Sequence, residues 1–276
     1  MNKYGRRPRI GVSMMAKNAE LFIGPVIRCL SWTDGIYLYD DNSNDHTIKN
    51  AQDSTRVPLI VESGRNKKSV FERGEMEIRN HLVCQVFKKL NCDLLVLVDS
   101  DELLSRNIKT VILQTFSDPK IDSLCFSIWH LYNKKKYIHF WETHMNGTYL
   151  IDPHIRVIRK SRRYEMGYPD GSHPFIRTTD LTRCIHGPYH YHLKYYHKSP
   201  YPNYSLGFLP EYPTPKQVKP YLRNLSFPIP ADVRRCIDMV DWSSISRMET
   251  SYYASYKSTR TTLTSREASI HPRDKK

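Results

Sequence analysis

The chain has 276 residues, and its 42 Lys and Arg stand against 28 Asp and Glu, which gives a formal net charge of +14. Hydrophobic residues make up 39% of the chain and aromatic residues 12%, which excludes a disordered protein of low hydrophobicity and allows a large core. The most apolar stretches, residues 21–27 and 94–98, are much shorter than the roughly 20 residues that cross a bilayer. The basic N-terminus also lacks the apolar segment of a secretory signal.

The first half of the chain alternates strand-like and helix-like segments. Short apolar strands are expected at residues 10–15, 36–39, 57–61 and 93–98. Helices are expected at residues 18–32, from residue 47 onwards, and at residues 75–90. Pro25 would kink the first helix, and the uniformly apolar fourth strand is typical of a central strand covered on both faces. The alternation predicts an open, mostly parallel α/β sheet of Rossmann type, flanked by helices, with ligands at the carboxyl ends of its strands.

The pattern changes after residue 120. β-like segments rich in aromatic and His residues are expected at residues 121–132, 137–141, 149–158 and 185–195. Prolines become dense over residues 199–230, which indicates an extended connector, and a short helix is expected at residues 231–241. We therefore divide the chain into an α/β half at residues 1–120, a β-rich half at 121–200, and an extended, basic C-terminal segment at 201–276.

Acidic side chains gather at the ends of two predicted strands. The second strand runs into the polar cluster 40–45, and the fourth delivers two carboxylates, Asp99 and Asp101, to the rim of the sheet. An unpaired carboxylate is costly to desolvate, so a cation is a natural partner. Such oxygen ligands suit Mg²⁺ or Mn²⁺, particularly when nucleotide phosphates complete the coordination shell. The alternative is that Asp99 or Asp101 caps the following helix, and the D-x-D pattern alone does not decide between the two.

Four short motifs follow one another along the first half: residues 10–20, residues 40–47, Arg79 with Asn80, and residues 99–102. In this order and spacing the chain resembles the nucleotide-sugar-binding half of the family 2 glycosyltransferases, which have the GT-A fold. The resemblance implies a metal-dependent enzyme that moves a sugar from a nucleoside-diphosphate sugar, with UDP as the expected nucleotide, to a hydroxyl acceptor with inversion. Mn²⁺ or Mg²⁺ is the implied cofactor. The first half would then bind the nucleotide sugar, and the second half would bind the acceptor and complete catalysis.

The resemblance also assigns roles in nucleotide binding. Met15 and Lys17 fall where the loop after the first strand lines the nucleobase pocket, and Asp41 falls where a carboxylate accepts a hydrogen bond from the base. Arg79 occupies the place of a basic residue near the nucleotide, a role that suits its permanent charge. Lys17 departs from the pattern, because relatives often place an aromatic residue there, so the nucleotide remains open.

A metal site is implied by the same resemblance. Asp99 falls beside the ribose or the metal, and Asp101 falls at the direct metal ligand. His190 and His192 would share one face of a strand, because side chains two residues apart point the same way, and a His in this region can complete the metal shell or contact the diphosphate. The alternative for the two histidines is a surface strand rich in Tyr and His.

Transfer to a hydroxyl also needs a base for the acceptor proton. Asp170, in a Tyr-Pro-Asp-Gly stretch, is the first candidate, and Glu142 and Asp152 are alternatives. Pro-Asp-Gly is also a common turn sequence, which would explain Asp170 without any catalytic role.

The acceptor is indicated by charge. Basic side chains interleaved with Tyr or Trp recur after the nucleotide-binding half, a composition compatible with phosphate contacts and base stacking. We favour DNA with hydroxymethylated or glucosylated bases, as modified by viral enzymes that decorate their own genomes. The alternatives are a lipopolysaccharide or lipid-linked glycan at a membrane surface, and a non-catalytic nucleic-acid-binding protein. Six scattered cysteines without a C-x-x-C pair indicate a reducing compartment, so we expect a cytoplasmic protein.

Overall fold

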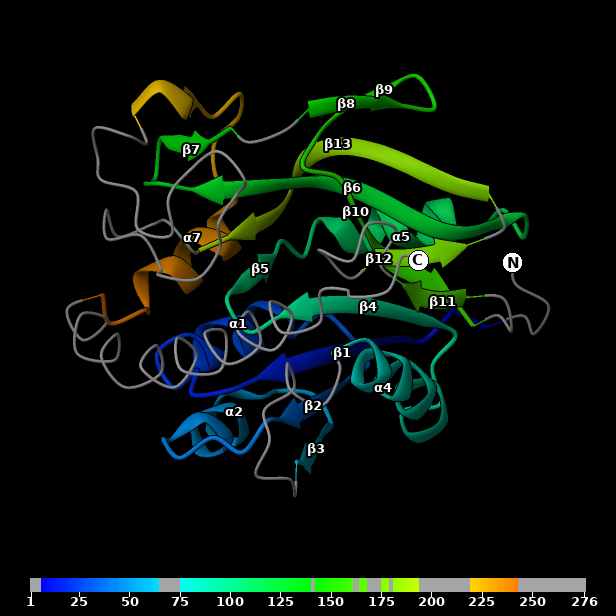
Figure 1. Ribbon diagram of the computed structural model, residues 1–276, viewed down its shortest axis with the longest axis vertical. Helices are drawn as coiled ribbons and strands as arrows, with labels where there is room; N and C mark the ends of the chain where they lie inside the picture. Colours follow the sequence, from blue (N-terminus) through cyan, green and yellow to red (C-terminus); the bar gives the residue numbers. More distant parts are fainter. Residues whose placement is uncertain are drawn as a thin grey trace, which may run out of the picture.

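The computed structural model describes residues 6–64, 75–139, 142–160, 164–167, 175–178, 181–193 and 219–242. Most of their strands join one ten-stranded mixed sheet, in the order β14-β7-β6-β10-β4-β1-β2-β3, with β13 beside β6 and β5 beside β13. In Figure 1 this sheet runs from β3 at the bottom of the view to β7 near the top.

The N-terminal half supplies the parallel part of the sheet. Its elements are β1 (Ile10–Ala16), α1 (Ile23–Cys29), β2 (Gly35–Asp40), α2 (Thr47–Ser54), β3 (Leu59–Ser63), α4 (Glu75–Lys89), β4 (Leu94–Asp99), β5 (Glu102–Leu104) and α5 (Ile108–Thr115). β1 lies between β2 and β4 and is parallel to both, and β3 is parallel to β2. The carboxyl ends of these four strands therefore meet at one edge, which confirms the predicted α/β class.

Both faces of the central strand β4 are covered. Along β4, Leu94, Val96 and Val98 belong to a core shared with α1, α5 and α7, whereas Leu95 and Leu97 belong to a second core shared with α4. This alternation is the two-residue period of a strand, and full coverage explains why the strand is apolar throughout.

The first predicted helix is wrong in its bounds. The sequence pattern suggested residues 18–32, but α1 is the seven-residue helix Ile23–Cys29. Asn18 has a φ of 47° and cannot belong to a right-handed helix. Pro25 then lies in the first turn, where its missing N–H costs no hydrogen bond, so it marks the beginning of the helix and does not kink it.

The second half is rich in strands, as predicted, and it extends the same sheet. Its elements are β6 (Ile121–Leu131), β7 (Lys136–Ile138), β8 (Glu142–Met145), β9 (Thr148–Ile151), β10 (His154–Arg159), β11 (Tyr164–Gly167), β12 (Phe175–Thr178), β13 (Leu181–His192), the 3₁₀ turn η1 (Lys219–Tyr221), β14 (Leu222–Asn224) and α7 (Ala231–Asp238). β10 is antiparallel to both β4 and β6, so it joins the two halves of the chain within one sheet.

Smaller elements surround this sheet. β8 and β9 form a separate hairpin, at the top of Figure 1, whose turn places Asn146 and Gly147 at positive φ. The predicted helix near the C-terminal end is confirmed as α7. Residues 199–218 of the Pro-rich stretch and residues 243–276 lie outside the described part of the chain, and residues 219–224 of that stretch form η1 and β14. Among the described helices, none combines the length and the apolar character needed to cross a membrane.

Candidate active site

The loops after β1 and β2 bring together three residues predicted to bind the nucleotide. Met15 pairs in register with Asp99 of β4, so it lies at the same edge as that carboxylate. Lys17 Nζ lies 3.3 Å from Asp41 Oδ2, and Asp41 is buried. The backbone N–H of Asp41 donates to the carbonyl oxygen of Ala16 at 2.8 Å, which holds the two loops together. An ammonium group and a carboxylate therefore stand side by side at the carboxyl edge of the parallel strands.

Asparagines shape these two loops. Asn18 and Asn42 have φ values of 47° and 56°, and Asn adopts this left-handed region more readily than most residues. The backbone N–H of Asn18 donates to Ser43 Oγ at 2.8 Å, and Asn18 Oδ1 accepts from the backbone N–H of Asn44 at 3.0 Å. The polar cluster after β2 thus fastens the loop after β1.

Asp99, at the end of β4, is paired with arginines. Arg79 of α4 donates from Nη2 to Asp99 Oδ1 at 3.1 Å, and Arg156 Nη1 of β10 lies 3.8 Å from Asp99 Oδ2. The sequence grouped Arg79 and Asp99 at the nucleotide, and the structure brings them into contact. Because both carboxylate oxygens face guanidinium groups, Asp99 is better placed to orient cationic side chains than to ligate a metal by itself.

Glu102 anchors the turn that carries the two aspartates. Its side chain is 3% exposed, Oε1 accepts from Arg156 Nη2 at 2.6 Å, and Oε2 accepts from the backbone N–H of Asp99 at 2.9 Å. Burial works against ionisation of Glu102, but the charge of the Arg156 guanidinium beside it outweighs burial and holds the pKa of this carboxyl well below its usual value. Glu102 therefore remains a carboxylate that fixes the backbone between β4 and β5.

Arg156 reaches Glu102 because β10 is irregular at this point. The register of β10 against β6 shifts between Ile155 and Val157, so Arg156 is the extra residue of a β-bulge. A bulge redirects a side chain relative to the regular alternation of a strand. Sequence reasoning missed Arg156 and assigned no role to Glu102.

Asp101 and His192 form the pair that fits a divalent cation. His192 Nε2 lies 3.0 Å from Asp101 Oδ2, and both side chains are partly exposed. A carboxylate oxygen and an imidazole nitrogen suit a Mn²⁺ or Mg²⁺ ion that takes its remaining ligands from phosphate oxygens and water. No group of three or more His, Cys, Asp or Glu residues within the described ranges is arranged to hold a metal. The donor set therefore fits an ion completed by its substrate and does not form a closed structural site.

His190, predicted as a metal ligand beside His192, lies elsewhere. It is completely buried, its Nε2 is 3.2 Å from Glu102 Oε2, and its ring packs edge-on against Phe126. The two histidines do not share a partner, because pairing with β5 covers His190 and aligns His192 with Glu102 at the beginning of that strand. His190 is thus a structural partner of Glu102, which corrects the prediction.

A cluster that sequence reasoning did not find continues from His192 into the second half of the chain. His130 Nδ1 lies 3.0 Å from His192 Nδ1, His130 Nε2 lies 2.6 Å from Asp152 Oδ2, and His154 Nε2 lies 3.3 Å from Asp152 Oδ1. Burial opposes ionisation of Asp152, but the charge of His154 and the hydrogen bond from His130 hold the pKa of the carboxyl well below its usual value. Beyond His192, only Asp152 of this cluster was considered from the sequence, as an alternative base, because the members of the cluster come from distant strands.

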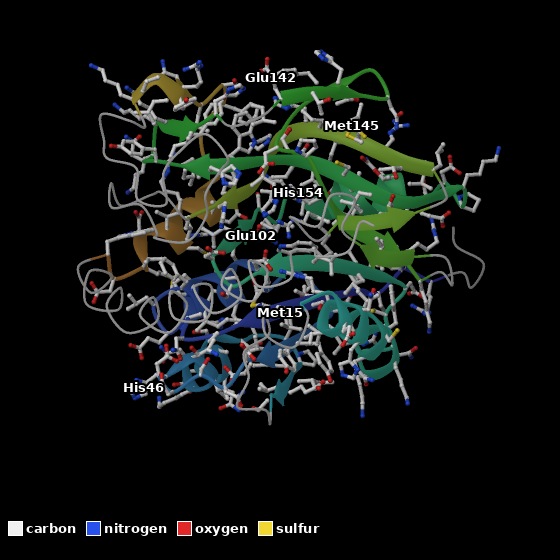
Figure 2. All side chains as sticks on the ribbon, viewed as in Figure 1. Met15, His46, Glu102, Glu142, Met145 and His154 are labelled. Atoms are coloured by element: carbon white, nitrogen blue, oxygen red, sulfur yellow. The ribbon has the colours of Figure 1, made fainter. Side chains whose placement is uncertain are left out.

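The other base candidates are not part of this cluster. Glu142 lies on β8, where its Oε2 accepts from Tyr149 Oη at 2.6 Å and lies 2.9 Å from His139 Nε2. Figure 2 places Glu142 at the upper edge of the molecule, well away from Glu102 and Met15, so the structure does not bring it to the aspartates. Glu142 lies apart from the aspartates because β8 belongs to a separate hairpin and does not pair with the main sheet. Asp170 lies outside the described residues.

Comparison with known proteins gave matches among solved structures alone. The sequence matches no protein-family model and no curated protein. The chain is similar to the crystal structure of S. aureus TarS 1-349, with 18% identity over 45% of this chain and 36% of that chain and a TM-score of 0.34. It is also similar to glucosyl-3-phosphoglycerate synthase from Mycobacterium tuberculosis in complex with Mg²⁺ and UDP, with 18% identity over 46% of this chain and 45% of that chain and a TM-score of 0.33. The chain thus spans less than half the length of these solved structures.

Proposed function

We propose that this protein is a metal-dependent, inverting glycosyltransferase that moves a sugar from a UDP-sugar to a hydroxyl group of a polyanionic acceptor, with hydroxymethylated or glucosylated DNA as the favoured acceptor. The observation that supports it is the convergence of Asp41, Asp99 and Asp101 at the carboxyl edge of the parallel strands, each beside a cationic or imidazole group. Ligands of open α/β sheets bind at this edge.

The donor would lie across the ends of β1, β2 and β4. Asp41 would accept a hydrogen bond from the nucleobase, and Lys17 beside it would be available to a carbonyl oxygen of the base. Arg79 presents a guanidinium group at the end of β4, next to Asp99, where it can donate to ribose or phosphate oxygens. The nucleotide is thus held by groups that the fold has already paired, which limits the reorganisation needed for binding.

Asp101 and His192 would hold Mn²⁺ or Mg²⁺. Such an ion supplies Lewis-acid stabilisation of the departing nucleoside diphosphate. Glu102 contributes indirectly, because its hydrogen bond to the Asp99 backbone fixes the turn from which Asp101 projects. Asp99 would orient the Arg79 guanidinium, which would place a positive charge on the diphosphate side of the site.

A basic surface supports the choice of a polyanionic acceptor. We call it the basic edge, and it consists of exposed side chains on the turn before β7, on β7, on η1 and on β14: Lys134, Lys135, Lys136, Lys219 and Arg223. β7 and β14 are adjacent strands, so these side chains lie on one continuous edge of the sheet. Lys134 pairs with Asp238 of α7, which leaves four of the five cations without a carboxylate partner within the described chain. A row of such charges suits a phosphate backbone.

The function is tested by incubating the protein with a panel of nucleotide sugars and Mn²⁺. Hydroxymethylated DNA, glucosylated DNA and lipopolysaccharide serve as acceptors, and products are identified by mass spectrometry. Transfer to DNA from a UDP-sugar is the expected result. Transfer only to lipopolysaccharide would replace the DNA acceptor by a glycan, and tight DNA binding without transfer in any arm would favour the non-catalytic alternative.

The basic edge has its own test. Reversing charge with Lys135→Glu and Lys136→Glu should weaken DNA binding and reduce the slope of log affinity against log salt by about 2, since each phosphate contact contributes about 0.9. Lys88→Glu and Lys89→Glu, at the exposed end of α4, form the matched control and should leave the slope near that of the unaltered protein. An equal loss in both pairs would mean that only net charge matters.

A further inference from the structure

A line of hydrogen-bonding side chains leads from the turn that carries Asp101 to His154. Asp101 contacts His192, His192 contacts His130, His130 contacts Asp152, and Asp152 contacts His154, with successive distances of 3.0, 3.0, 2.6 and 3.3 Å. The five residues come from the turn before β5, from β13 and β6, and from the β9–β10 connection with the start of β10. In Figure 2 His154 and Glu102 lie in the middle of the molecule, between Met15 and the hairpin that carries Glu142.

The histidines of this line differ in the hydrogen-bond partners of their ring nitrogens. An ionised carboxylate only accepts hydrogen bonds, so the Nε2 atoms of both His130 and His154 donate to Asp152. His130 then uses its second ring nitrogen toward His192. Within the described part of the chain, Nδ1 of His154 has no hydrogen-bond partner. Nδ1 is therefore the ring nitrogen of His154 that is available to an acceptor hydroxyl.

Exposure points to the same end of the line. The side chains of His130 and His192 are 9% and 15% exposed, whereas that of His154 is 32% exposed. An incoming acceptor can reach His154, while the groups behind it are shielded. A carboxylate here orients an imidazole. In the Ser-His-Asp triad, a buried Asp orients a His in the same way, and that His takes a proton as general base.

The backbone at Asp152 is held in an unusual conformation. Its φ is 41°, in the left-handed region that residues with a side chain rarely adopt, and Asp152 directly follows β9. The preceding N–H, that of Ile151, donates to Ser127 Oγ at 3.0 Å and so fixes the approach to this residue. Residues in sparsely populated backbone conformations cluster at functional sites, and Asp152 combines such a conformation with contacts to two imidazoles.

The strand that carries His154 runs toward the donor side of the site. β10 pairs antiparallel with β4 through Val157 and Val96, so the residues before Val157 extend toward the carboxyl end of β4. Arg156, two residues after His154, already contacts Glu102 and Asp99. His154 thus stands on the acceptor side of the same edge at which the sugar donor would lie.

We infer that His154, oriented by Asp152, is the general base of the proposed transfer. The inference rests on the proposed function. The acceptor oxygen forms a bond to the anomeric carbon while the bond from that carbon to the diphosphate oxygen breaks and its electron pair leaves with the nucleoside diphosphate. The acceptor proton passes to Nδ1 of His154, the resulting imidazolium is stabilised by Asp152, and the proton is later released to water.

Other charged groups surround the pair and set its pH dependence. His130 of β6 faces Asp152, and Arg156 lies on the same strand as His154. Arg156 in turn contacts Asp99 of β4 and Glu102 of β5. A general base must be unprotonated to act, so an acidic limb of the pH profile that belongs to His154 should disappear when this residue is replaced.

The test uses the full chain with its donor, Mn²⁺ and the acceptor found active. His154→Gln retains a donor toward Asp152 but removes the base, and kcat should fall by about 100-fold or more while the KM for the donor is unchanged. Added imidazole should restore part of the activity of His154→Ala. Asp152→Asn, the positioning variant, should lower kcat and alter the acidic limb of the pH profile. His81→Gln, which breaks a surface His–carboxylate pair of similar length, 3.2 Å to Glu62, is the matched control and should not change kcat.

The outcomes separate this inference from the proposed function. If the unaltered protein transfers no sugar to any acceptor, the function fails and the inference fails with it. If it transfers sugar and His154→Gln retains kcat and the acidic limb, only the base assignment is overturned. If His154→Gln loses activity but melts like the unaltered protein, and imidazole rescues His154→Ala, the assignment stands; a loss with no rescue and an intact acidic limb overturns it.

Discussion

Replacing Glu102 by Gln tests the buried anchor of the site. The change removes one charge from a side chain that is 3% exposed and leaves the Arg156 guanidinium, 11% exposed, with its next carboxylate oxygen 3.8 Å away on Asp99. Breaking a buried pair in this way costs about 3–5 kcal/mol, because the remaining charge stays desolvated. At about 2–4 °C per kcal/mol, the melting temperature should fall by roughly 6–20 °C. The Gln carbonyl can still accept from the Asp99 N–H, so the loss measures charge.

A double-mutant cycle followed by thermal and urea unfolding separates the pair from its parts. Adding Arg156→Met to Glu102→Gln removes the second charge and should recover most of the lost stability. Lys49→Gln, which breaks the exposed pair with Asp53 on α2, is the control and should cost less than about 1 kcal/mol. If Glu102→Gln melts like the unaltered protein, or if the two single losses simply add, the pair does not anchor the turn and the reasoning is wrong.

Three further predictions concern the site and its surroundings. Asp101→Asn should abolish transfer and the thermal shift caused by Mn²⁺ with UDP, while the melting temperature without ligands stays within a few degrees; unchanged turnover would refute the metal assignment. Asp41→Asn should weaken UDP binding about tenfold in calorimetry, the cost of one charge-assisted hydrogen bond, and equal affinity would remove Asp41 from the nucleobase pocket. Burial lowers the pKa of His190, so the unfolded state alone gains a proton as pH falls below about 6.5, and stability should fall over that range. His190→Gln should flatten this dependence in urea titrations at a series of pH values, and an unaltered slope would show that another group causes it.

The parallel strands could be predicted because their signal is local. The strands at 10–15, 36–39, 57–61 and 93–98 are short apolar runs, and each appears in the structure within two residues at either end. Burial of β1, β2 and β4 explains the apolar composition of three of these runs, since a strand covered on two faces carries few polar residues. Placing the acidic clusters at the strand ends then followed from topology, because parallel strands end at one edge.

The second half of the site could not be predicted in this way. His130, Asp152 and His192 come from three separate segments, and the pairing of β13 with β6 that aligns His192 with His130 spans 62 residues along the chain. The two-residue alternation of a strand predicted that His190 and His192 lie on one face. How deeply each side chain is buried depends on the pairing with β5, which covers His190. A bulge at Arg156 is likewise invisible to a two-residue period, since the extra residue is inserted between regular ones.

Three acidic residues at and just after the end of β4 differ in burial, and this difference divides their roles. Asp99 ends the strand and meets two arginines, Asp101 projects from the turn toward His192, and Glu102 turns inward to Arg156 and His190. Each carboxylate therefore has a partner before any ligand arrives, so a basic protein can hold three acids together without mutual repulsion. Of the three carboxylates, only Asp101 is both partly exposed and paired with an imidazole, that of His192. A divalent cation can therefore take the place of the proton shared by Asp101 and His192. Under the proposed function, the cations of the basic edge would then be available to the acceptor.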